Sequence, residues 1–108
     1  MSGRASRDKG NRFERWLVHF FTDMGWYAKR VPMSGAADGF KDDVHFARTR
    51  DDWEQGRKWH AECKRWKAGM KTVYRYLPSN GILVYKSDGE EELIIMSADT
   101  FKELVNRP

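Results

Sequence analysis

Two acidic residues and a lysine have the types and spacing needed for metal-assisted phosphodiester chemistry. Asp43 stands at the start of a predicted strand, and Glu62 and Lys64 lie in the next predicted strand. Residues two apart on a strand point to one face, so Glu62 and Lys64 should lie side by side. Two carboxylates on adjacent strands would form an oxygen site suited to Mg²⁺, with Mn²⁺ able to substitute. Such a metal could polarise a phosphodiester and acidify a bound water, while Lys64 could position that water or stabilise charge on phosphorus.

The same pattern has a plainer interpretation as an ion pair on the protein surface, because Glu-x-Lys is short and common. His60 shares the face of Glu62 by alternation, and His45 lies on the corresponding face of the preceding strand. Lone histidines are more often structural or surface groups than metal ligands. Cys63 is expected to be a small buried strand residue whose backbone carbonyl could contribute to metal binding.

Positive charge is concentrated in two segments of the chain. The 108 residues contain 20 Lys and Arg against 16 Asp and Glu, and the excess lies in residues 1–15 and 57–75. Phosphate backbones attract such clusters through counterion release, although a solvated basic surface without a partner is the alternative. Within these segments we expect nucleic-acid contacts from Arg12, Arg65, Lys67 and Lys71.

The elements that would position these residues can be predicted from periodicity and turn signals. Apolar residues follow a helical stripe over residues 11–25, with Gly25 as the stop. Strands are expected at 26–31, 43–48 and 57–65, with a loop over 32–41 and a turn over 51–56. A weaker helix over 67–77, strands at 82–86 and 93–96, and a final helix capped by Ser97 or Asp99 complete the chain.

This order, α-β-β-β-α-β-β-α, predicts the α/β class, with a mixed β-sheet flanked by helices. The length suggests a single domain over residues 1–108, in which residues 1–9 form a basic N-terminal arm that could be flexible. No apolar run is long enough to span a bilayer, and the N-terminus lacks the apolar segment of a signal peptide. One cysteine excludes an intramolecular disulfide, so a reducing cytoplasm is the expected location.

Four short blocks occur in the order found in a known family. They are Lys9-Gly10-Asn11-Arg12-Phe13-Glu14-Arg15, Arg30-Val31-Pro32-Met33-Ser34-Gly35, Asp43-Val44 and Glu62-Cys63-Lys64. The set resembles the PD-(D/E)xK nuclease superfamily and, more narrowly, the archaeal-type Holliday junction resolvases, which also occur in phages. The resemblance covers roughly residues 9–66 and implies a restriction-endonuclease-like core.

The resemblance implies a homodimer that binds four-way DNA junctions by their structure and cuts two opposing strands with a divalent metal. It makes Glu14, Asp43 and Glu62 the acidic site residues and Lys64 the catalytic lysine. Ser34 matches a loop serine required in some members. The basic positions that contact DNA in the family correspond to Lys9, Arg15 and Arg30. A membrane and a small-molecule substrate are not expected, and a phage-encoded chain would act in the host cytoplasm.

The chain departs from the family pattern in three places. Asp42 stands where the family usually has proline, so Asp42 could be the ligand instead; Asp43 is preferred because it directly precedes the strand residue Val44. The loop from Gly35 to Asp42 carries extra residues, and the region after Lys67 is shorter than in many members, which affects the expected dimer surface. A related nuclease for other branched or linear DNA, or a non-catalytic DNA-binding module, are the alternatives.

Overall fold

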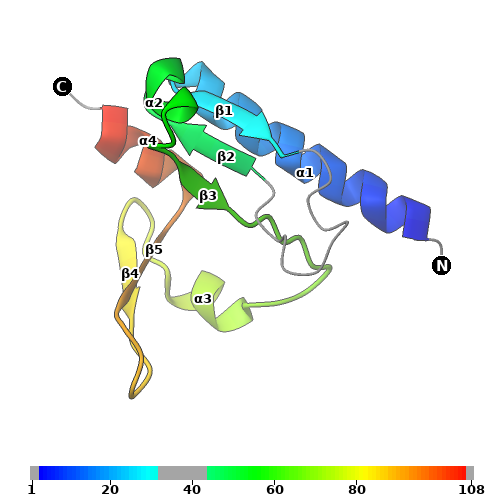
Figure 1. The fold of residues 1–108 in the computed structure, drawn as a ribbon. Helices are drawn as coiled ribbons and strands as arrows, with labels where there is room; N and C mark the ends of the chain where they lie inside the picture. Colours follow the sequence, from blue (N-terminus) through cyan, green and yellow to red (C-terminus); the bar gives the residue numbers. More distant parts are fainter. Residues whose placement is uncertain (1–2, 32–43, 107–108) are drawn as a thin grey trace. The chain divides into compact units, whose positions relative to one another are not determined.

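The computed structural model describes residues 3–31 and 44–106, with side chains from Gly10 onward. It contains both helices and strands, which confirms the α/β class (Figure 1). The chain divides into two compact units, residues 1–65 and residues 66–108. No helix of the described ranges is long and apolar enough to cross a membrane.

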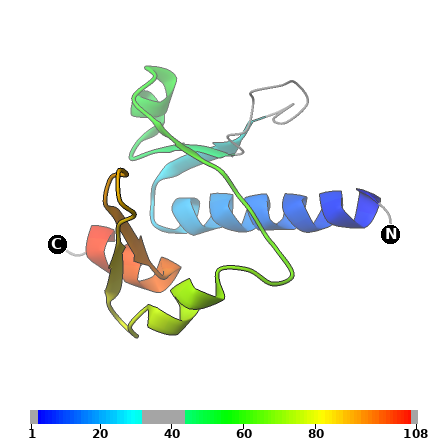
Figure 2. The same ribbon diagram turned by 90° about the horizontal axis from the view of Figure 1, so that it is seen from below.

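The first unit consists of two helices and a three-stranded antiparallel sheet in the order β1-β2-β3. Its elements are α1 (Gly3–Asp23), β1 (Tyr27–Arg30), β2 (Val44–Ala47), α2 (Arg50–Glu54) and β3 (Trp59–Ala61). Figure 2 shows α1 running along one side of this sheet, with α2 on the other side. We call the side toward α1 the helix face and the opposite side the outer face.

The apolar stripe of α1 accounts for the packing on the helix face. Phe21 is buried and stacks on Phe46 of β2 with ring centroids 4.1 Å apart, next to the buried Ala28 of β1. Burying aromatic rings in this way is the main gain that holds a helix against a sheet. The expected stop at Gly25 is confirmed, because Gly25 has a φ of 84° and Trp26 N–H donates to the Phe21 carbonyl at 3.0 Å, as in a Schellman motif.

The first unit differs most clearly from the sequence prediction in three places. Helix α1 begins at Gly3, so it includes basic residues that were assigned to an N-terminal arm. Residues 50–54 form the short helix α2 where a turn was expected, because the Thr49 side chain caps it by accepting from Asp52 N–H at 3.0 Å. Strand β3 ends at Ala61, so Glu62, Cys63 and Lys64 follow the strand instead of lying within it.

The second unit contains α3 (Lys71–Tyr76), the antiparallel hairpin of β4 (Ile82–Tyr85) and β5 (Leu93–Met96), and α4 (Ala98–Asn106). The expected hairpin and the final helix are confirmed, and α3 is shorter than predicted. Ser97 caps α4 by accepting from Thr100 N–H at 3.1 Å. The described strands thus form two antiparallel sheets, one in each unit.

Candidate active site

One end of the three-stranded sheet brings together the segments that carry the predicted site. Arg30 at the end of β1 pairs with Val44 at the start of β2, and Val44 pairs with Ala61 at the end of β3. Val44, at the centre of this row, has no exposed surface. We call this row and the residues that adjoin it the site end of the sheet. Residues that directly precede Val44 or follow Ala61 therefore start from neighbouring strands at one edge.

Glu14 and Arg30 meet at the site end. Arg30 Nε donates to Glu14 Oε1 at 3.0 Å, and Arg30 Nη2 donates to Asn11 Oδ1 at 2.7 Å. The Glu14 side chain is only 19% exposed, whereas that of Arg30 is 38% exposed. Two residues from different blocks of the family motif thus hold α1 and β1 together, and the guanidinium is fixed by two acceptors while it still faces solvent.

Glu62 and Lys64 also lie together, as their spacing predicts. Lys64 Nζ is 3.0 Å from Glu62 Oε2, and both side chains reach solvent. The contact does not require β3 to continue, since the strand ends at Ala61. A carboxylate and an ammonium at this distance can act on one phosphate group, with the ammonium next to the developing negative charge.

The two histidines meet on the outer face. His45 and His60 are direct partners across β2 and β3, and their rings stack at 4.0 Å with an angle of 11°. The expectation that they share a face is therefore confirmed. Within the parts of the chain that the structure describes, no group of three or more His, Cys, Asp or Glu residues is arranged to hold a metal ion.

Several predicted site residues cannot be placed. Ser34, Asp42 and Asp43 lie outside the described residues, and only the backbone of Lys9 is described, in α1. Cys63 is partly buried. The remaining predicted DNA contacts are all exposed, namely Arg12 and Arg15 on α1, Arg65 at the end of the first unit, and Lys67 and Lys71 in the second unit.

A further group of charged and aromatic residues lies beyond the opposite end of β2, where the sequence did not predict a site. Arg57 bonds Asp52, with Nη2 2.8 Å and Nε 2.9 Å from Oδ1. Hydrogen bonds from Arg57 and then from Thr49 hold the pKa of Asp52 below its usual value. The available signal was the run Arg57-Lys58-Trp59, an aromatic residue in a basic segment.

Comparison with known proteins bears on the site end. Residues 5–50 match the family model of archaeal Holliday junction resolvase, which confirms the resemblance drawn from the motifs. The match covers α1, β1 and β2 and includes Glu14, Arg30 and Asp43. At family level it supports a resolvase-like nuclease that acts on junction DNA. No curated protein and no solved structure matches the chain.

Proposed function

We propose that the chain is a metal-dependent endodeoxyribonuclease that cuts opposing strands of four-way DNA junctions as a homodimer in the cytoplasm. The observation that carries the proposal is the register at the site end of the sheet. Strand β2, which lies within the matched residues 5–50, pairs with β3 through Val44 and Ala61. The Glu62–Lys64 pair directly follows Ala61 in the chain.

The register gives a specific expectation for Asp43. Val44 pairs with Ala61 in an antiparallel ladder. In the sequence, Asp43 directly precedes Val44 and Glu62 directly follows Ala61. We propose that Asp43 and Glu62 supply carboxylates to the same metal ion, because each adjoins a paired position of neighbouring strands in the sequence.

The donor set suits a hard divalent cation. Asp43, Glu62 and Glu14 offer carboxylate oxygens, and the backbone carbonyl of Cys63 lies next to Glu62 in the chain. Oxygen ligands of this kind are preferred by Mg²⁺, and Mn²⁺ accepts them too. When bound, the metal would supply Lewis-acid polarisation of the phosphodiester and a lower pKa for the attacking water.

The chain's own residues would orient the DNA and stabilise charge. Lys64, held 3.0 Å from Glu62, would offset negative charge on the phosphate as water attacks in line and the 3′-oxygen leaves. Arg30, aligned by Glu14 and Asn11, would bind a neighbouring phosphate. Ser34 would contribute a hydroxyl group. The exposed basic residues of α1, with Arg65, Lys67 and Lys71, would bind the phosphates of the junction arms.

A dimer follows from the substrate. One chain offers one such site, and a four-way junction needs two cuts placed symmetrically, which a twofold pair of subunits provides.

The site assignment is tested with Asp43→Ala and Glu62→Ala. Both variants should bind a labelled four-way junction as the wild type does, yet lose Mg²⁺-dependent cutting by at least about a hundredfold. Asp88→Ala is a matched control, because Asp88 is an exposed carboxylate of the second unit. If both site variants cut at the wild-type rate, the assignment is wrong; if the wild type binds but never cuts with any divalent metal, the chain is a binding module.

A further inference from the structure

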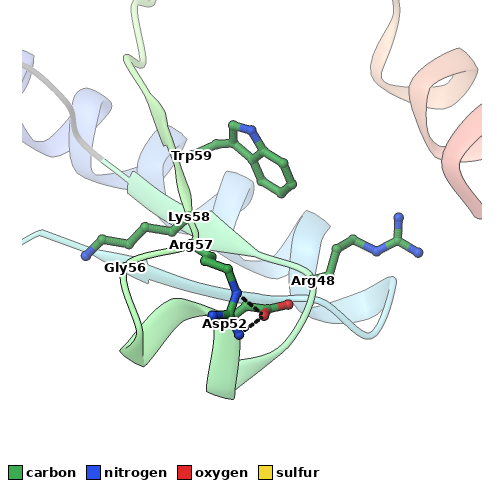
Figure 3. Close-up of a pocket in the computed structure, with 6 residues that line it drawn as sticks. All are labelled: Arg48, Asp52, Gly56, Arg57, Lys58 and Trp59. Carbon is green, nitrogen blue, oxygen red and sulfur yellow. Dashed lines mark hydrogen bonds and ion pairs between the residues drawn. The ribbon is translucent and has the colours of Figure 1, made fainter.

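A pocket of about 390 Å³ opens beside α2 and the start of β3, within the first unit (Figure 3). Its lining residues are Arg48, Asp52, Gly56, Arg57, Lys58 and Trp59. The volume is in the range of roughly 300–1,000 Å³ found for small-ligand sites. Three cations and one carboxylate line the pocket, so it carries a net positive charge. None of these residues belongs to the site end of the sheet.

The three cations of the pocket are not equivalent. Arg57 is neutralised by its ion pair with Asp52 at 2.8 Å. Arg48 lies over an indole ring, with Cζ 4.7 Å from the centre of Trp26, and Lys58 Nζ lies 4.2 Å from the centre of the Trp53 ring. Neither Arg48 nor Lys58 forms an ion pair with a carboxylate of the described chain. Their charge is therefore available to an anion.

Trp59 gives the pocket a large aromatic surface. The Trp59 ring packs against Trp26 and Phe46, with ring centroids 6.2 and 5.7 Å away, yet Trp59 remains 55% exposed. In Figure 3 the Trp59 and Arg48 side chains extend to the right of the view, whereas the Lys58 side chain extends to the left. Since both also contact Trp26, that ring fixes them relative to each other.

We propose that this pocket binds one unpaired nucleotide of DNA, with its base stacked on Trp59 and its phosphate held by Arg48. An exposed aromatic ring beside an uncompensated cation is the combination by which proteins bind single-stranded nucleic acid. The inference rests on the proposed function only in taking DNA as the ligand. It adds a reason for branched DNA to be favoured, because unpaired bases are available where arms separate and are stacked away in a linear duplex.

The test measures binding without divalent metal, so that cutting plays no part. A labelled oligothymidine single strand and a hairpin duplex are titrated with the wild type, Trp59→Ala, Trp59→Phe and Arg48→Gln. Trp59→Ala should weaken binding of the single strand roughly fivefold to hundredfold and leave duplex binding within twofold. Trp59→Phe should retain most of the affinity, since a phenyl ring still stacks, and Arg48→Gln should weaken single-strand binding several-fold.

Two control variants separate the pocket from general effects. Trp16→Ala removes another exposed indole of the first unit, and Arg50→Gln removes a neighbouring charge that is already paired with Glu54 at 3.3 Å. Both should bind the single strand as the wild type does. The proposal would be overturned if the variants lost affinity equally for the single strand and the duplex. It would also be overturned if Trp59→Ala, or Arg48→Gln, lost no affinity for the single strand. A change of oligomeric state in Trp59→Phe would overturn it as well, because that would assign Trp59 to a protein contact.

The outcome is independent of the nuclease assignment. If Trp59→Ala loses single-strand affinity while the wild type cuts no junction, the pocket stands and the proposed function fails. If the wild type cuts junctions and Trp59 variants bind both DNAs normally, the pocket proposal fails alone.

Discussion

The two ends of the three-stranded sheet hold their cations in different ways. At the site end, Arg30 and Lys64 each lie 3.0 Å from a carboxylate, Glu14 and Glu62. At the other end, Arg48 and Lys58 lie on indole rings, whereas Arg57 is paired with the carboxylate of Asp52. Both ends belong to the first unit and are only a few residues apart along the strands.

The difference indicates two kinds of contact with a nucleic acid. Carboxylates among the cations of the site end lower its attraction for phosphate, and the divalent metal proposed for this end would restore positive charge. Cations on aromatic rings keep their charge and stay ordered, which suits direct binding of a strand without metal. We therefore expect DNA binding at the Trp59 end to be metal-independent and the site end to control cutting.

The largest effect that separates the two ends is expected from Lys64→Met. Loss of the ammonium next to the reacting phosphate should slow junction cutting about 10²–10³-fold, while binding without metal changes little. Single-turnover cutting of a labelled junction measures this. Lys102→Met in α4 is the matched control, and cutting by Lys64→Met at the control's rate would remove Lys64 from the mechanism.

A smaller effect is expected from Arg30→Gln. Without its guanidinium the site end loses one phosphate contact, so junction affinity should fall several-fold for every sequence and the salt dependence should lose about one unit of slope. Fluorescence anisotropy at several salt concentrations measures both quantities. The free energy of unfolding should change by less than about 1 kcal/mol, as for other partly exposed ion pairs. An unchanged salt slope would show that Glu14 keeps Arg30 away from DNA.

The smallest effect is expected from Asp52→Asn beside the Trp59 pocket. The pKa of Asp52 is lowered, mainly by the Arg57 hydrogen bond, so ionised Asp52 stabilises the folded state above its unfolded pKa near 3.8. This stabilisation is lost as the pH falls through the lower folded pKa. The thermal midpoint of Asp52→Asn should therefore lie below that of the wild type at neutral pH, and the difference should vanish in acid. A difference that is constant with pH would exclude the charge as its cause, and Asp51→Asn, with a 3.9 Å contact to Arg57, should show less.

The fold was predictable where the sequence pattern is local and strong. The apolar stripe and Gly25 predict the body and the end of α1, because both depend on neighbours within one or two turns. The start of α1 was not predicted, since residues 3–9 have no apolar periodicity. Helix α2 was missed because five residues rich in Asp resemble a turn, and the Thr49 cap decides between the two.

The candidate site was predictable only in part for a related reason. Glu62 and Lys64 contact each other as expected, although the strand on which that prediction rested ends at Ala61, and the His45–His60 pair follows from alternation on adjacent strands. The Glu14–Arg30 contact joins a helix and a strand 16 residues apart, and no local pattern specifies it. The Trp59 pocket depends on Arg48 and Trp59 both meeting Trp26, which only the packed structure reveals.

The central claim is that the site end of the sheet cuts branched DNA with a divalent metal. The most direct measurement compares a four-way junction, labelled in turn on each strand, with a linear duplex of the same sequence, in Mg²⁺ and in EDTA. We expect paired cuts on two opposing strands of the junction in Mg²⁺, little cutting of the duplex, and none of either DNA in EDTA. Equal cutting of junction and duplex, or cutting that persists in EDTA, would contradict the claim.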